Sequence, residues 1–199
     1  MDVAVNPSKP EDMSSGFFIL DKNKDVCYTY NSTIKKKGAR KMSNIEAGRL
    51  FEREMLAVCQ TGWNGHSYVS FQQALWLVEN NQPWDPTDPS TRAAEDLHCQ
   101  VALALGLEDF TELSFLSALG SPLDLFHGVD GLFEWKGGIV TIDLTVDPNK
   151  VNYKADLSSN QIRYRSDVII RPEDENDNWQ SAGRRIASLL QTRKGAYAA

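Results

Sequence analysis

The sequence predicts an α/β protein with a central mixed β-sheet flanked by helices, and three stretches carry this prediction. Two β-rich runs on either side of a glycine-containing turn predict a β-hairpin at residues 131–146. A capping box that starts at Ser43 opens an amphipathic helix, which we expect to end near Gln60. The apolar run within residues 165–171 predicts a buried strand, and a final amphipathic helix follows it.

The composition limits the class of protein. The chain has 199 residues, of which 41% are hydrophobic, and this suits one folded domain with an inserted subdomain. No apolar run reaches the length of a membrane span, and the N-terminus lacks a secretory signal pattern. Three separated cysteines without a CxxC pair favour a reducing, cytoplasmic location and disfavour structural zinc. The net charge of -6 argues against a nucleic-acid coat protein, but it allows a local basic groove.

The chain is expected to have two parts. Residues 1–42 form an N-terminal tail with a β-hairpin around the polar turn 21–25, and residues 43–199 form the main domain. Within the main domain, residues 66–122 are expected to be a helical insertion, because apolar residues recur there at helical spacing. The expected helices of this insertion are 70–80, 91–106 and 109–119.

Glu52 falls on the apolar side of the first predicted helix. At about 100° per residue it lies in the same arc as Ile45, Phe51 and Met55. A carboxylate that faces a core costs free energy unless a cation or ligand compensates it. Two interpretations follow: Glu52 extends to solvent or pairs with a buried cation, or it borders a polar site beside the sheet.

Two acids mark the predicted hairpin at residues 131–146. Asp130 precedes the first strand, and Asp143 lies within the second, on the same face as Thr145 and opposite the expected core face. Across the strand pair the two carboxylates come close enough to meet at one point, where they can hold a hard cation such as Mg²⁺. In the alternative interpretation Asp130 only forms a turn, and Asp143 faces solvent from an edge strand.

Basic residues provide candidate contacts to nucleic acid. A cluster of lysines and arginines precedes the first helix, and two further arginines lie before the last strand. Such residues either form solvated loops or contact a phosphate backbone. The candidate phosphate contacts are Lys35, Lys36, Lys37, Arg40, Lys41, Arg163 and Arg165.

The order of these features resembles the PD-(D/E)xK nuclease superfamily, which has the restriction-endonuclease-like fold. The resemblance covers about residues 43–60 and 128–191, and the residues between them would be an insertion. It is supported by the apolar strand Val168-Ile169-Ile170 and the closing helix. The motifs that carry it are Gly48-x-x-Phe51-Glu52, Gly128-Val129-Asp130 and Asp143-x-Thr145.

The resemblance implies hydrolysis of phosphodiester bonds in DNA with Mg²⁺ or Mn²⁺. Asp130 and Asp143 would hold the metal, which polarises the phosphoryl oxygen and activates a water nucleophile. Glu52 would complete the metal shell or orient that water. The resemblance also implies that two copies of the chain can act as a homodimer.

One position departs from the superfamily motif. Members usually carry a lysine two residues after the second acid, where its charge offsets the charge of the transition state. Thr145 occupies this position here, so Lys150 or Lys154 is expected to supply the charge, and Thr145 is expected to position water. The missing lysine leaves a second function open, an inactive nuclease-fold protein that binds nucleic acid or a protein partner. A third is an unrelated α+β binding module in which the acids face solvent.

Overall fold

The computed structural model describes residues 18–21, 26–29, 42–64, 67–150 and 166–195. The chain divides into two compact units, Met1–Met42 and Ser43–Ala199. In the first unit β1 (Phe18–Asp21) and β2 (Val26–Thr29) pair antiparallel, which confirms the predicted hairpin. The predicted site residues that lie outside the described ranges are Lys35, Lys36, Lys37, Arg40, Lys41, Lys154, Arg163 and Arg165.

The second unit contains a four-stranded mixed sheet with the strand order β3-β4-β5-β6. β3 (Ser114–Ser117), β4 (Gly131–Trp135) and β5 (Gly138–Leu144) are antiparallel neighbours, and β6 (Val168–Ile170) runs parallel to β5. The β4–β5 turn has positive φ at both of its central residues, the backbone geometry that tight hairpins favour. These strands confirm the predicted α/β class, the mixed sheet and the hairpin.

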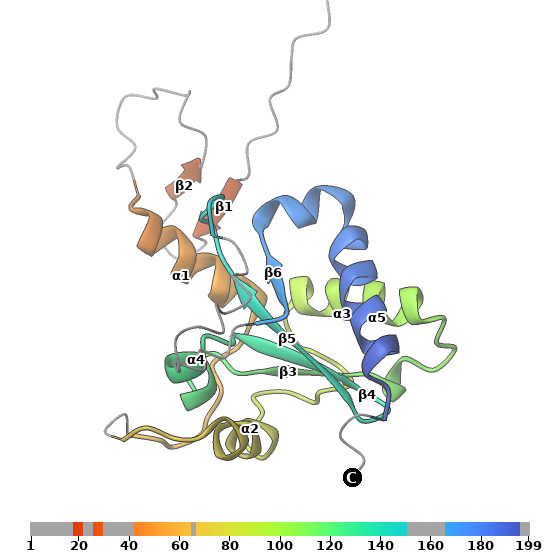
Figure 1. The fold of residues 1–199 in the computed structure, drawn as a ribbon. Helices are drawn as coiled ribbons and strands as arrows, with labels where there is room; N and C mark the ends of the chain where they lie inside the picture. The colour runs from red at the N-terminus through yellow and green to blue at the C-terminus, as the bar shows by residue number, and fades with distance from the viewer. Residues whose placement is uncertain (1–17, 22–25, 30–41, 65–66, 151–165, 196–199) are drawn as a thin grey trace, which may run out of the picture. The chain divides into compact units, whose positions relative to one another are not determined.

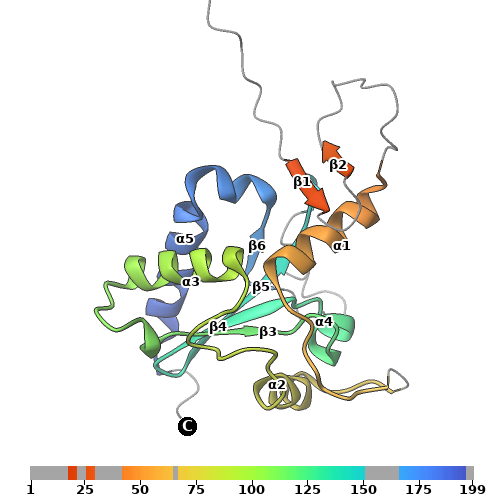
Figure 2. The ribbon, with the colours of Figure 1, turned by 180° about the vertical axis from the view of Figure 1, so that it is seen from behind.

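Helices cover both faces of this sheet. α3 (Arg92–Leu105) and α5 (Gln180–Arg193) pack side by side on one face, whereas α2 (Phe71–Glu79) and α4 (Pro122–His127) lie on the other (Figures 1 and 2). A Cβ added to Gly183 of α5 would lie 2.9 Å from the carbonyl carbon of Gln100 in α3. The absence of a side chain at Gly183 therefore lets the two helices approach closely.

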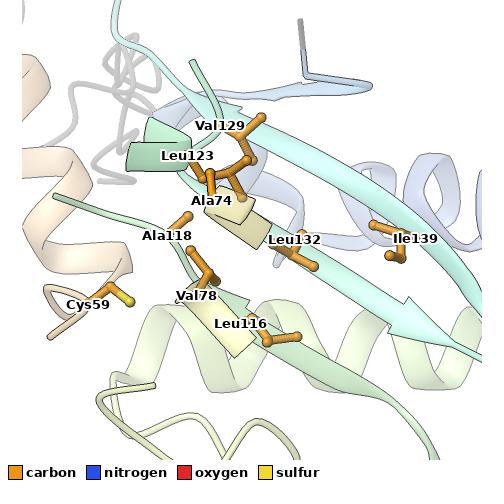
Figure 3. Close-up of a cluster of buried hydrophobic side chains, with 9 residues drawn as sticks. All are labelled: Cys59, Ala74, Val78, Leu116, Ala118, Leu123, Val129, Leu132 and Ile139. Carbon is orange, nitrogen blue, oxygen red and sulfur yellow. The ribbon is translucent and has the colours of Figure 1, made fainter. Parts of the chain in front are cut away.

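An apolar cluster joins α2 and α4 to the sheet (Figure 3). Ala74 and Val78 from α2 and Leu123 from α4 pack onto Leu116 and Leu132 of the strands. All of these side chains are buried, so the hydrophobic effect fixes α4 against the sheet. Further members are Cys59, Ala118, Val129 and Ile139.

The first helix of the second unit is shorter than predicted. α1 (Asn44–Met55) begins with the predicted capping box at Ser43, but Leu56 is already extended, with φ -127° and ψ 140°. The backbone after α1 bonds to other parts of the fold, for example from Cys59 N–H to Leu119 O at 2.9 Å. The predicted burial of Ile45 is also wrong, because its side chain is 69% exposed.

The helix predicted at residues 109–119 is wrong. Only Phe110–Glu112 forms a 3₁₀ turn, and β3 follows it. β3 pairs with β4, and the rings of Phe115 and Phe133 stack with their centroids 4.1 Å apart. Cross-strand pairing of this kind is not visible in a local sequence pattern. The predicted helical insertion at residues 66–122 therefore also contributes one strand to the sheet.

Candidate functional site

Four carboxylates from four different segments converge beside β5. They are Glu52 on α1, Asp124 on α4, Asp130 just before β4, and Asp143 on β5, and we call them the acid cluster. Asp130 is only 5% exposed and Asp143 only 7%. The charges of the other three members all raise the pKa of Asp130, which shows that the four side chains act on one another.

Asp130 lies at the centre of the acid cluster. Its Oδ2 accepts a hydrogen bond from Leu144 N–H at 2.6 Å, and its carboxyl group also hydrogen-bonds to those of Asp124 and Asp143. A hydrogen bond between two carboxyl groups requires a proton. Burial is the largest cause that raises the pKa of Asp130, which reaches about 8, and the charges of its acidic neighbours also raise it. The hydrogen bond from Leu144 N–H opposes this shift. Asp130 is therefore mainly protonated at pH 7 in the metal-free protein.

Asp143 is held by a lysine. The Nζ of Lys150 lies 2.8 Å from Oδ1 and 2.7 Å from Oδ2 of Asp143, so the ammonium group contacts both carboxylate oxygens. Burial raises the pKa of Asp143, and the nearby charges of Lys150 and Arg171 oppose that shift. Lys150 thus brings a positive charge to the acid cluster from the segment that follows β5.

Glu52 and Asp124 border the cluster. Burial raises the pKa of Glu52, the charges of Asp124 and Asp143 raise it further, and Lys150 is among the cations that oppose the shift. Burial likewise raises the pKa of Asp124, whose Oδ2 accepts a hydrogen bond from Gly120 N–H at 2.8 Å. The raised pKa values share one largest cause, which is burial, and the charges of neighbouring carboxylates add to it for Glu52, Asp124 and Asp130.

The core positions two of these acids. Leu123 precedes Asp124 and Val129 precedes Asp130, and both apolar side chains belong to the cluster of Figure 3. Burying Leu123 and Val129 therefore fixes the backbone on which the two acids are carried. The N-cap Ser121 starts α4 and accepts hydrogen bonds from the Leu123 and Asp124 N–H groups, which orients the first turn of this helix.

Sequence reasoning identified most of this arrangement. The structure brings Glu52, Asp130, Asp143 and Lys150 together, all of which were predicted site residues. Asp124 was not predicted, and the available signal for it was the helix start Ser121-Pro122, which lies two residues before it.

The hydrogen bonds of Thr145 go to backbone groups outside the acid cluster. Its Oγ1 accepts from Asp147 N–H at 3.1 Å, and its own N–H donates to Ile170 O at 3.0 Å. No hydrogen bond between Thr145 and the acid cluster is found in the described part of the chain. Its predicted role of positioning water stays a prediction.

The carboxylate oxygens of the acid cluster suit a hard cation, but in this structure they are not arranged to hold one. Within the described ranges, no group of three or more His, Cys, Asp or Glu side chains is placed to hold a metal ion. One local cause is visible, since the ammonium group of Lys150 contacts both carboxylate oxygens of Asp143. Carboxylate oxygens are nevertheless the ligands that Mg²⁺ prefers, and a divalent cation would relieve the charge excess that raises these pKa values.

Comparisons of the chain with models of protein families, with curated proteins and with solved structures give no match. In the part of the chain that the structure describes, no helix is long and apolar enough to span a bilayer. Function must therefore be argued from the acid cluster and its surroundings.

Proposed function

We propose that the chain is a metal-dependent nuclease that hydrolyses phosphodiester bonds in DNA, built on a restriction-endonuclease-like core. The observation that carries the proposal is the convergence of acids on the buried Asp130, with its pKa raised to about 8. The order of elements supports it: α1 carries Glu52, Asp130 precedes β4, Asp143 lies on β5, and β6 and α5 follow. This is the order on which the resemblance to the PD-(D/E)xK superfamily rests.

Asp130, Asp143 and Glu52 are the proposed ligands of Mg²⁺ or Mn²⁺. When bound, such a cation polarises a phosphoryl oxygen and lowers the pKa of an attacking water. Asp130 would hold the cation as a carboxylate, without its proton, and the hydrogen bond to Asp124 positions the Asp130 side chain. Metal binding therefore competes with protons, and its affinity rises with pH up to about the pKa of Asp130.

Lys150 takes the part of the lysine that is missing from the motif. Its ammonium group neutralises Asp143 when no metal is present. With a cation on Asp143, the ammonium group of Lys150 would remain beside the acids, where its charge would offset the charge that develops on the phosphate. Lys154 is the other predicted candidate, and it lies outside the described residues.

A cleavage assay tests this function. Supercoiled plasmid and single-stranded DNA are incubated with Mg²⁺ or Mn²⁺ and either wild type or the Asp143→Asn variant, which keeps the shape of the side chain. The expected result is metal-dependent cleavage by wild type and a loss of about 100-fold or more in the variant. The control is Asp109→Asn, because Asp109 is an exposed N-cap and asparagine caps equally well. Equal cleavage by both variants rules out this mechanism.

One observation favours the alternative, an inactive nuclease-fold protein that binds nucleic acid or a protein partner. Lys150 contacts both oxygens of Asp143, so this pair neutralises itself without a metal. Calorimetry with Mn²⁺ separates the two functions, since the inactive protein shows no binding that depends on Asp130 or Asp143. The DNA substrate and the homodimer stay predictions.

A further inference from the structure

A basic pocket of about 700 Å³ lies between β6 and α5, next to the acid cluster. Its volume falls within the range of small-molecule sites, roughly 300–1,000 Å³, and exceeds what a single phosphate ion needs. The chain as a whole carries a net charge of -6, whereas the charged side chains that line this pocket are mainly positive. Among the described residues, the charged ones that line it are four cations, Lys150, Arg171, Arg184 and Arg185, and one carboxylate, Asp167.

The carboxylate in the basic pocket is already neutralised. Asp167 receives two hydrogen bonds from Arg193, at 2.6 Å to Oδ2 and 2.7 Å to Oδ1. Among the described residues, the salt bridges at the pocket also engage Lys150 and Arg185, and Arg184 takes part in none of them. Lys150 pairs with Asp143 and Arg185 with Asp174, so Arg171 and Arg184 are the lining cations without a salt bridge among the described residues.

The helix dipole does not explain the position of Arg184, whose charge acts on Asp177 just before the helix and lowers the pKa of that carboxyl group. α5 begins at Gln180, so Arg184 lies in its N-terminal half, where the helix dipole disfavours a cation. Arg185, by contrast, has a structural role, because it pairs with Asp174 at 2.7 Å and donates to Ile169 O at 3.3 Å. Arg184 is exposed and contributes to neither contact.

The basic pocket shares residues with the acid cluster. Lys150 lines the pocket and holds Asp143, and the charge of Arg171 also acts on Asp143. The Arg171 guanidinium group donates to Lys150 O, which ties the two cations together. An anion in this pocket is therefore adjacent to the proposed metal ligands.

We propose that the basic pocket binds the phosphate groups of a nucleic-acid strand and so places one phosphodiester at the acid cluster. The second half of this statement rests on the proposed nuclease function, whereas the binding itself does not. The chain's own segment 151–165 is a poor occupant by charge, because it carries three cations, Lys154, Arg163 and Arg165, against one acid, Asp156. An anion from outside the chain matches the pocket better.

The test measures binding without metal. A fluorescein-labelled 12-nucleotide single strand is titrated with protein in EDTA, and its anisotropy is recorded at several salt concentrations. Arg184→Ala is expected to weaken binding about tenfold and to reduce the slope of log affinity against log salt by about 0.7. Arg184→Lys should keep most of the affinity, because it keeps the charge. The matched control is Arg92→Ala on α3, since the Arg92 side chain is 95% exposed and does not line the pocket.

The outcomes distinguish the binding of a strand in the basic pocket from the nuclease function. Equal affinities of Arg184→Ala and Arg92→Ala overturn the proposal, and so does binding of dTMP at the pocket without any binding of the strand. Binding that depends on Arg184, together with no cleavage when metal is added, supports the pocket and removes the nuclease function. Cleavage that Arg184→Ala leaves unchanged removes the pocket alone. Thermal melting of each variant confirms that it is folded.

Discussion

Replacing Asp130 with asparagine should stabilise the metal-free protein at neutral pH. The native state holds a proton on Asp130 that the unfolded chain releases, because the pKa of this group is raised from 3.8 to about 8. The sign follows from proton linkage: the free energy of unfolding of wild type falls as pH rises from about 4 to about 8, and then levels off. Asparagine at position 130 does not ionise, so it removes this fall in the free energy of unfolding. Its side-chain oxygen can still accept the hydrogen bond from Leu144 N–H.

The size of the effect follows from the same pKa. At pH 7 the proton retained on Asp130 costs about 4 kcal/mol of folding free energy relative to an ordinary aspartate. The stability difference between Asp130→Asn and wild type is therefore expected near zero at pH 4, and it should grow by about 1.4 kcal/mol per pH unit through the neutral range.

Urea denaturation in EDTA at pH 4, 5, 6, 7 and 8 measures this difference. The control is Asp88→Asn, because Asp88 is an exposed aspartate outside the acid cluster. With Mn²⁺ the order should reverse, since a bound metal stabilises wild type but not a variant without the ligand. A difference for Asp130→Asn that does not change with pH would contradict the raised pKa of the buried Asp130.

Three further predictions concern the fold and the cations. Gly183→Ala should cost about 1–3 kcal/mol in urea denaturation, because the new Cβ meets Gln100 at 2.9 Å; an unchanged midpoint contradicts the close packing of α3 and α5. Burial alone raises the pKa of Asp167, but hydrogen bonds from Arg193 and others outweigh it and lower the pKa. Its stabilisation is present above the ordinary pKa of 3.8 and is lost as pH falls through the lowered pKa of the folded state. Asp167→Asn should therefore cost about 1 kcal/mol at pH 7, and thermal melting should show that the cost shrinks as pH is lowered below 3.8; a cost that does not change with pH refutes the pairing. Lys150→Met should strengthen Mn²⁺ binding in calorimetry and yet slow cleavage, whereas weaker metal binding would contradict competition for the carboxylate.

Local sequence signals predicted the structure correctly where contacts between residues close in sequence determine it. The capping box at Ser43, the helix expected at residues 91–106 and the glycine-containing turn of the hairpin all lie where they were expected. These features work through contacts between residues close in sequence, so a single sequence reveals them. The two acids of the hairpin were found for the same reason, since strand alternation and pairing fix their faces.

Predictions failed where distant residues decided the structure. β3 has an apolar pattern compatible with a helix, and only its pairing with β4 makes it a strand. Leu56 leaves the helix because the backbone beyond it bonds to Leu119 and other distant partners. Asp124 joins the acid cluster through the packing of Leu123 in the core, which the sequence does not reveal.

Calorimetric titration of metal-free protein with Mn²⁺ at pH 7, repeated in two buffers of different ionisation enthalpy, tests most directly whether the acids form a metal site. A site made by Asp130 and Asp143 should bind one ion and release about one proton, and both signals should disappear in Asp130→Asn and in Asp143→Asn. No heat of binding in wild type, or binding that both variants retain, would contradict the assignment of these acids as metal ligands.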